Sequence, residues 1–226
     1  MKKRILIYGG GAHAQYTIDI IEKENKYKII GITDPYKKVG SIVYEYPILG
    51  KQEQIVELIK QYNIQGGIIS IGDNFTRSYV YDIIKKLVPN FEFVNAIHPS
   101  TVIGKNVKLG VGLIIMAGCI INPGCKISDF CFFATGAQLD HDSFMGVFSS
   151  ISAGSITGGN VKIGAYSAIT LGVIVMDRIS IGENTVIGSG ALVTKDLPDN
   201  VLAYGVPAKI IRNREKGEKF LKSGIS

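Results

Sequence analysis

From residue 97 onward, large apolar residues recur at every sixth position without a change of register. Sixteen of the seventeen positions in this series are large and apolar, and the exception is Thr157. The series is Ile97, Ile103, Leu109, Ile115, Ile121, Ile127, Phe133, Leu139, Met145, Ile151, Thr157, Ile163, Ile169, Val175, Ile181, Ile187 and Val193. An α-helix has a period of about 3.6 and a strand a period of about 2, so neither explains the spacing. The pattern predicts a hexapeptide β-helix, in which each repeat forms one side of a prism.

A second series, four residues after each apolar position, is occupied mostly by small residues. It includes Cys119, Cys125 and Cys131, which we therefore expect to be small buried side chains. These are all the cysteines of the chain, and none is in a CxxC pair. Zinc binding and thiol redox chemistry are accordingly disfavoured.

The first 95 residues show a different pattern, in which short apolar runs alternate with amphipathic segments. Strands are expected at residues 4–8, 28–33, 66–72 and 91–97, with helices at 16–24, 52–62 and 75–87. Such alternation predicts a small parallel sheet covered by helices. We therefore expect an α/β domain at residues 1–95, a β-helix domain at 96–205 and a basic tail at 206–226.

The first strand is followed by residues 9–14, GGGAHA, a G-x-G-x-x-A pattern between strand and helix. Amides at a helix N-terminus bind phosphate, so Gly9, Gly11, Ala12 and His13 are candidate nucleotide contacts. Asp34 ends the second strand, where an acid is positioned to accept from a ribose hydroxyl. Because only one mononucleotide-binding half is present, a half-Rossmann domain is expected and NAD is disfavoured.

A second candidate binding loop follows the third expected strand. It contains Gly72, Asp73 and Asn74, which would lie at the ligand-binding edge of the parallel sheet.

Composition narrows the possibilities further. The 226 residues are 46% hydrophobic and carry a net charge of +6, with basic residues concentrated near the C-terminus. These basic residues are Lys209, Arg212, Arg214, Lys216, Lys219 and Lys222. A solvated tail and an anion-binding role are both open for this cluster. The apolar run after the N-terminal lysines is too short for a signal peptide, and no run is long enough to span a membrane, so we expect a cytoplasmic protein.

The repeat region contains one segment with chemistry beyond folding. His141 is one of only three histidines in the chain and stands between Asp140 and Asp142. A histidine titrates near neutral pH and is suited to proton transfer. Either neighbouring carboxylate would orient the ring and stabilise the imidazolium.

The two halves together, with GDN at 72–74, NAIHPS at 95–100, DHD at 140–142 and GVPAK at 205–209, resemble one family over nearly the whole chain. It comprises the bacterial nucleotide-sugar acetyltransferases of surface-glycan pathways. They include the N-acetyltransferases of bacillosamine and perosamine biosynthesis and related sialic acid O-acetyltransferases, all within the hexapeptide-repeat acyltransferase superfamily.

This resemblance implies a left-handed β-helix with three hexapeptides per coil, a homotrimer, and acetyl-CoA as cosubstrate without a metal. The implied acceptor is the C4 amine of a nucleoside-diphosphate-linked 4-amino-4,6-dideoxy sugar. His141 is then the general base of a direct transfer, and Asp142 its partner. Acetyl-CoA would lie along Gly154 and Gly172, with Pro207 and Lys209 near its adenosine end.

The chain departs from many relatives at one position. They carry a second histidine nine residues after the first, where this sequence has Ser150. Ser150 is therefore the expected replacement for a contact to the acetyl group or the acceptor.

Four other functions share some of these sequence features. A sialic acid-type O-acetyltransferase remains open as the alternative. A γ-type carbonic anhydrase needs three histidine ligands, whereas His141 is alone in the repeat region. A non-catalytic sugar-binding scaffold would not require the His141–Asp142 pair. An NAD oxidoreductase would need a second nucleotide-binding half. No nucleic-acid partner or membrane span is expected.

Overall fold

The computed structural model describes residues 1–220, and the chain separates into two compact units. The first comprises Met1–Gly72 and Thr76–Pro99, and the second comprises Asp73–Phe75 and the chain from Ser100 onward. The expected boundary at 95/96 thus differs from the observed division after Pro99. The short segment Asp73–Phe75 makes its contacts with the second unit although its neighbours in sequence belong to the first.

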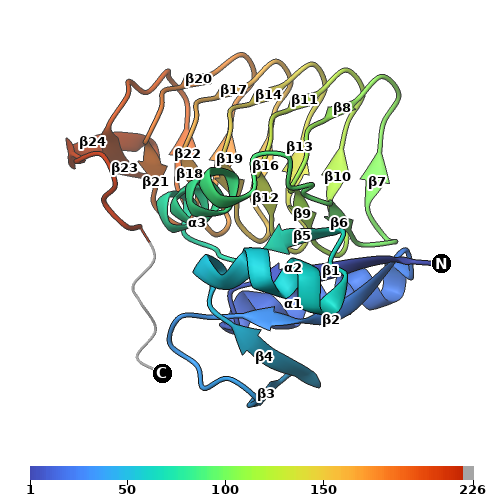
Figure 1. Cartoon of the computed structure of the whole chain (residues 1–226). Coiled ribbons are helices and arrows are strands. Elements are labelled where there is room, and N and C mark those ends of the chain that lie inside the picture. The colour runs from blue at the N-terminus through green and yellow to red at the C-terminus, as the bar shows by residue number, and fades with distance from the viewer. Residues whose placement is uncertain (221–226) are drawn as a thin grey trace. The chain divides into compact units, whose positions relative to one another are not determined.

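The first unit is the expected α/β domain (Figure 1). Its elements are β1 (Lys3–Tyr8), α1 (Ala12–Glu24), β2 (Tyr27–Thr33), β3 (Ile42–Val43), β4 (Tyr46–Gly50), the 3₁₀ turn η1 (Gln52–Gln54), α2 (Ile55–Tyr62), β5 (Gly66–Ile69), α3 (Asn74–Leu87) and β6 (Ala96–Ile97). Strand order in the sheet is β3-β4-β2-β1-β5, and β4, β2, β1 and β5 are parallel. The hairpin β3–β4 was not predicted from the sequence.

The sheet of the first unit is hydrophobic on both faces. The central strand β1 buries Ile5, Leu6 and Ile7 completely, as expected for a parallel strand covered on both sides. The carboxyl ends of β1, β2 and β5 lie at one edge of the sheet, where Gly9 and Ser70 continue the backbone ladder. Ligands bind at this edge in open parallel sheets.

The second unit is a left-handed β-helix made of two-residue strands (Figure 1). They are β7 (Val102–Ile103), β8 (Lys108–Leu109), β9 (Ile114–Ile115), β10 (Ile120–Ile121), β11 (Lys126–Ile127), β12 (Phe132–Phe133), β13 (Gln138–Leu139), β14 (Phe144–Met145), β15 (Ser150–Ile151), β16 (Ile156–Thr157), β17 (Lys162–Ile163), β18 (Ala168–Ile169), β19 (Ile174–Val175), β20 (Ser180–Ile181), β21 (Val186–Ile187) and β22 (Leu192–Val193).

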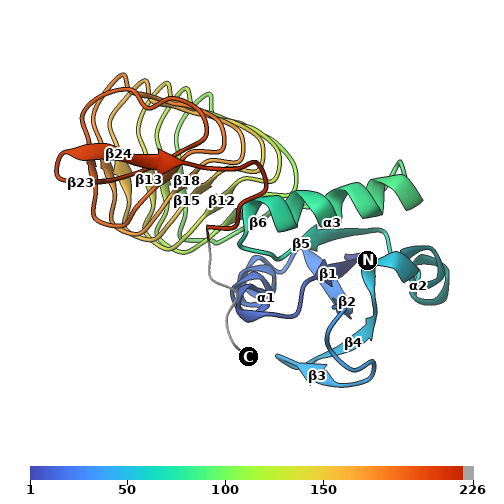
Figure 2. The same cartoon turned by 90° about the vertical axis from the view of Figure 1, so that its left-hand side faces the viewer.

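Every third strand pairs in parallel, so each coil contains three hexapeptides. One face carries β22-β19-β16-β13-β10-β7 and a second carries β20-β17-β14-β11-β8. The third contains β21-β18-β15-β12-β9, and we call these the D, E and C faces respectively. Viewed along its axis in Figure 2, the prism shows its coils superposed.

The period-six residues form the core of the prism, as predicted. Ile121, Phe133, Leu139 and Ile151 are completely buried, whereas Ile103, in the first coil, is 40% exposed. The three cysteines are buried and free, as expected, and each thiol contacts a backbone carbonyl of a neighbouring coil.

The expectation of a basic tail at 206–226 is wrong over part of its length. Strands β23 (Val201–Gly205) and β24 (Ala208–Asn213) form a hairpin that extends the C face. Arg212 and Arg214 pair with Glu218, and Arg214 is buried. Lys222, which belonged to the basic cluster, lies outside the described residues.

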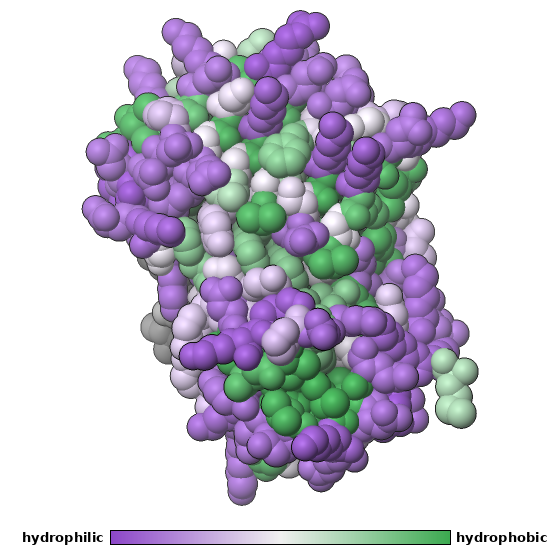
Figure 3. Space-filling view, turned by 45° about the horizontal axis from the view of Figure 1, so that its top comes forward, coloured by the Kyte–Doolittle hydropathy of each residue, from purple (hydrophilic) through white to green (hydrophobic). Residues whose placement is uncertain are grey.

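The face of the molecule in Figure 3 is mostly hydrophilic. It carries one large apolar patch in the lower part of the view and smaller groups of apolar residues above it. Within residues 1–220, no helix is both long enough and apolar enough to cross a membrane.

Candidate active site

His141 lies at the corner between the D and E faces, in the turn from β13 to β14. Asp142 has a positive φ of 56°, which turns the chain sharply at this point. The side chains of His141 and Asp142 are 51% and 63% exposed. The corner therefore presents both groups to solvent.

Asp142 is the acid that contacts the imidazole. Its Oδ2 lies 3.0 Å from Nδ1 of His141. The hydrogen bond with Asp142 raises the pKa of His141, and the negative charges of Asp140, Asp142 and Asp177 act in the same direction. With Nδ1 donating to the carboxylate, Nε2 of the neutral ring is left as the acceptor.

Asp140 has a structural role in the same turn. Its Oδ1 accepts hydrogen bonds from the backbone N–H of His141 at 2.7 Å and from Nδ2 of Asn122 at 2.6 Å. The hydrogen bond from His141 lowers the pKa of Asp140. The backbone N–H of Asp140 donates to Thr157 Oγ1 at 3.1 Å, which gives the one polar residue of the apolar series a partner. Asp140 thus holds the backbone of His141, and Asp142 holds its ring.

The imidazole packs on the next coil. A Cβ at Gly159 would collide with Nε2 and Cε1 of His141, so only glycine leaves room for the ring. Gly159 itself donates its N–H to Asp177 Oδ1 at 2.9 Å. On the preceding coil, Gly124 leaves room for the carboxylate of Asp142 in the same way. Neither glycine was identified from the sequence, because both lie eighteen residues from the group they accommodate.

The residues expected near acetyl-CoA occupy three different places. Gly154 and Gly172 lie on successive coils at the corner between the C and D faces and are exposed. Ser150 is buried in β15 on the C face, and its hydroxyl has no hydrogen-bond partner among the described residues. Pro207 and Lys209 are exposed in the β23–β24 hairpin. Within one chain, none of the five adjoins His141 along the D–E corner.

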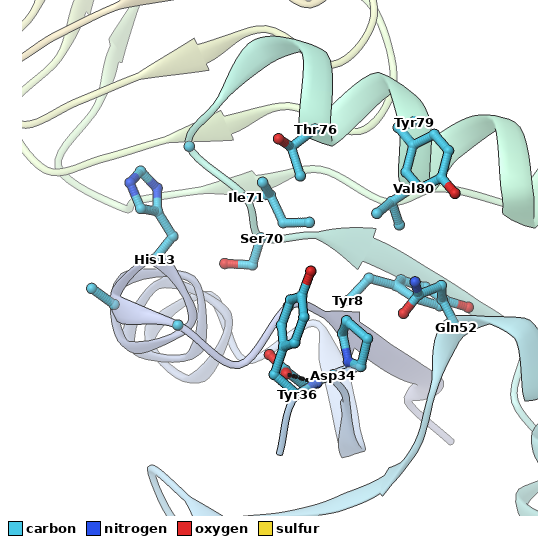
Figure 4. Close-up of a pocket in the computed structure, with 15 residues that line it drawn as sticks. Tyr8, His13, Asp34, Tyr36, Gln52, Ser70, Ile71, Thr76, Tyr79 and Val80 are labelled. Atoms are coloured by element: carbon cyan, nitrogen blue, oxygen red, sulfur yellow. Dashed lines mark hydrogen bonds between the residues drawn. The ribbon is translucent and has the colours of Figure 1, made fainter. Parts of the chain in front are cut away.

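A pocket of about 310 Å³ lies at the carboxyl edge of the sheet in the first unit (Figure 4). Gly9, Gly11, Ala12 and His13, all expected to contact a phosphate, line it. Burial lowers the pKa of His13, and the positive charge of Arg77 lowers it further. The ring packs over Gly72, where a Cβ would collide with it.

Asp34 also lines this pocket, and its carboxylate accepts hydrogen bonds from backbone N–H groups. Oδ2 accepts from the backbone N–H of Gly10 at 2.8 Å, and Oδ1 accepts from those of Tyr36 and Lys37 at 2.9 and 3.2 Å. Asp34 therefore connects the glycine loop to the loop after β2. A carboxylate has about four acceptor sites, so acceptance from a ribose hydroxyl at the remaining site on Oδ2 stays a prediction.

The GDN loop divides between the two units. Gly72 lines the pocket, whereas Asp73 and Asn74 are buried among residues of the second unit. Asn74 Nδ2 donates to the carbonyl oxygens of Tyr166 and Ser167, both at 3.1 Å. Phe75 stacks on Tyr166 with ring centroids 4.6 Å apart, at the end of a column with Phe148 and Phe130. Asp73 and Asn74 thus do not line this pocket, and their role in substrate binding stays a prediction.

No group of three or more His, Cys, Asp or Glu residues suited to a metal ion occurs within residues 1–220. The chemistry available at the D–E corner is proton transfer by His141, oriented by Asp142.

Comparison with known proteins agrees with this architecture. Residues 4–84 match the family model described as the PglD N-terminal domain. PerB from Caulobacter crescentus, solved with CoA and GDP-perosamine, is 34% identical, with 92% of this chain and 97% of PerB covered at a TM-score of 0.85. A histidine-to-alanine variant of GDP-perosamine N-acetyltransferase from the same organism is 33% identical, with the same coverage and a TM-score of 0.87.

The acetyltransferase domain of PglB from Neisseria gonorrhoeae shares the fold at 24% identity and a TM-score of 0.85, with 93% of this chain and all of that domain covered. The sequence identity of 34% to PerB is higher than a shared fold alone requires, and the matched region extends through both units. This chain therefore belongs to the family of hexapeptide-repeat sugar N-acetyltransferases with a PglD-type N-terminal domain, enzymes that use acetyl-CoA as the acyl donor.

Proposed function

We propose that the protein transfers an acetyl group from acetyl-CoA to the C4 amine of a nucleoside-diphosphate-linked 4-amino-4,6-dideoxy sugar in surface-glycan biosynthesis. The observation that carries the proposal is the His141–Asp142 pair, exposed at a corner of the prism with Nε2 available as a base. PerB, a relative at 34% identity, was solved with CoA and GDP-perosamine. Variants of that enzyme with alanine or asparagine in place of a histidine were solved with the same ligands.

In the proposed reaction the sugar amine attacks the thioester carbonyl carbon and forms a tetrahedral oxyanion. The nitrogen becomes cationic and loses its proton to Nε2 of His141, while Asp142 stabilises the resulting imidazolium. Collapse of the oxyanion breaks the C–S bond and releases CoA, which receives a proton. Transfer is direct, because the three cysteines are buried and burial raises the pKa of Cys119 to about 11.

The nucleotide sugar is assigned to the pocket of the first unit, with its diphosphate at the glycine loop. Gly11 and Ala12 stand at the start of α1, where unpaired backbone N–H groups and the helix dipole favour an anion. His13 lies beside them, and burial lowers its pKa, which favours the neutral, hydrogen-bonding ring.

The acetyl-CoA site is assigned to a groove between copies of this chain in a homotrimer. The D face supports this assembly, because its outward residues are mostly apolar and several are exposed: Val102 by 59%, Ile156 by 41% and Ile174 by 51%. The outward positions of the E face are mostly polar instead, with Lys108, Lys126, Lys162 and Ser180 beside the exposed Phe144, which suits solvent. Three D faces around a common axis would bring the D–E corner of one copy to the C–D corner of its neighbour. His141 of one copy would then meet Gly154 and Gly172 of the next.

A sialic acid-type O-acetyltransferase is the alternative, in which His141 takes the proton of a sugar hydroxyl. The pocket argues for the N-acetyltransferase, because a glycine loop at a helix N-terminus suits a diphosphate, which a free sialic acid lacks.

The test is release of free thiol from acetyl-CoA with UDP-, dTDP- and GDP-linked 4-amino-4,6-dideoxy sugars and with free sialic acid. Release with a nucleotide-linked amino sugar, lost in His141→Ala, supports the proposal. Release with sialic acid alone supports the alternative. Full activity of His141→Ala with any acceptor contradicts the assignment of the base. His98→Ala is the matched control, since it removes a histidine that is not in the proposed site.

A further inference from the structure

The pocket of the first unit has two chemically different ends (Figure 4). His13 lies at one side of the view, near the glycine loop, whereas Gln52 and Tyr8 lie at the other. Val80 and Tyr79 from α3 add apolar surface to the lining. If the diphosphate occupies the glycine end, the second end is available to a nucleobase.

Gln52 is a buried polar residue at this second end. It begins η1, directly after β4, and is 7% exposed. Its Nε2 donates to Oε1 of the neighbouring Glu53 at 3.1 Å, and this bond defines which side of the carboxamide carries the nitrogen. The amide oxygen and the second N–H remain for a ligand, so Gln52 offers one acceptor beside one donor.

Tyr8 is the second polar group. It is 1% exposed at the end of β1, and its hydroxyl has no hydrogen-bond partner within residues 1–220. The ring is held edge-on to Phe91, with centroids 5.9 Å apart, and packs against Gly67. Burial raises the pKa of Tyr8 well above its ordinary value, so the hydroxyl stays neutral. A buried hydroxyl without a partner is unfavourable, and a ligand atom at this end would remove that cost.

Carboxylates are scarce in the pocket. Among the described residues that line it, Asp34 is the one acid, and both of its oxygens accept backbone N–H groups. The Watson–Crick edge of guanine presents adjacent donors at N1 and N2, which a carboxylate, being acceptor only, satisfies best. The imide edge of uracil or thymine presents one donor, N3–H, beside carbonyl acceptors. A carboxamide accepts from N3–H and donates to the neighbouring carbonyl, so it matches the imide edge fully. On guanine it would pair N1–H and O6 and leave the N2 donors unmatched.

We propose that this end of the pocket binds a pyrimidine base, with Gln52 hydrogen-bonding the imide edge and Tyr8 adding a further polar contact. Gln52 is thereby a specificity-determining residue that selects a uridine or thymidine diphosphate sugar over a guanosine diphosphate sugar. The inference rests on the proposed function, since it assumes that the pocket holds the nucleotide. It assigns this chain a different base from the GDP-perosamine bound by PerB.

Calorimetric titration with UDP, dTDP, GDP and ADP tests the inference on the wild-type full-length protein. We expect UDP or dTDP to bind about tenfold or more tightly than GDP, the difference that one well-paired amide provides. Gln52→Glu replaces the donor with a second acceptor. It should therefore lower the affinity for UDP and dTDP and raise the affinity for GDP. Gln61→Glu makes the same chemical change at an exposed position of α2 and should leave all affinities unchanged. Tyr8→Phe should weaken the preferred nucleotide by about threefold to tenfold.

The outcomes separate this inference from the function on which it rests. Tighter binding of GDP than of UDP and dTDP by the wild type overturns the base assignment and leaves the acetyltransferase proposal intact. An unchanged preference in Gln52→Glu overturns the role of Gln52. Binding of none of the four nucleotides overturns both proposals. If Gln52→Glu fails to fold, the wild-type ranking and Tyr8→Phe still decide the question.

Discussion

The imidazole of His141 lies on Gly159, one coil further along the prism, in the space that a side chain at position 159 would occupy. Gly159 is buried and its N–H is held by Asp177, so the backbone beneath the ring has little freedom to move. The ring position therefore depends on the absence of a single methyl group.

Gly159→Ala should displace the ring of His141 without unfolding the prism. We expect kcat to fall by about 10- to 100-fold, because proton transfer depends on the position of Nε2. KM for the sugar should change little. Steady-state kinetics in a double-mutant cycle with His141→Ala measures the effect. In the His141→Ala background, Gly159→Ala should not lower kcat further. A further fall in kcat of equal size there would indicate general damage to the coil.

The pH profile of kcat/KM should reflect the contact between His141 and Asp142. The base acts in its neutral form, and the hydrogen bond with Asp142 raises the pKa of His141. The acidic limb of the wild-type profile should therefore lie above the ordinary histidine value of about 6.5.

Asp142→Asn should move that limb to lower pH, because the stabilisation of the imidazolium is lost, and should reduce the maximal rate by about 100-fold or more. Asparagine tolerates the positive φ at this position, so the turn is retained. A limb that stays in place in Asp142→Asn would contradict the role of Asp142.

Asn74→Ala should destabilise the protein without weakening nucleotide binding. It removes both hydrogen bonds to the carbonyl groups of Tyr166 and Ser167, in a fully buried site. A loss of about 1–3 kcal/mol in the free energy of unfolding is expected. Denaturant titration with nucleotide calorimetry checks both parts, and the exposed Asn90→Ala is the control. Weakened nucleotide binding at unchanged stability would show that Asn74 contributes to nucleotide binding.

Ile174→Glu should disrupt the proposed trimer. A carboxylate in the middle of the apolar D face would be buried without a partner in the assembly. Light scattering after size exclusion should show a monomer, and acetyl transfer should be lost because each groove needs two copies. Ser180→Glu places the same charge on the E face and should leave mass and activity unchanged. A trimeric, active Ile174→Glu would contradict the assignment of the D face.

The two domains and the position of the proposed base could both be predicted from the sequence. A strict period of six admits one regular structure, since only a coil of three flat sides buries every sixth residue, and Leu139 and Ile151 are buried accordingly. His141 was identifiable because an imidazole between two acids has no role in filling a repeat. The glycine loop was identifiable because a strand, a glycine-rich turn and a helix are contiguous.

Which groups remain available for chemistry depends on the folded structure. Asp140 and Asp142 are equivalent in the sequence, but the first binds backbone N–H and Asn122 and the second binds the ring. Asp34 accepts hydrogen bonds from three backbone N–H groups, and Asn74 donates to carbonyl groups more than ninety residues away in the chain. Whether a side chain is available for chemistry depends on the hydrogen-bond partners that folding brings to it. These partners are too far away in the sequence for a local pattern to reveal them.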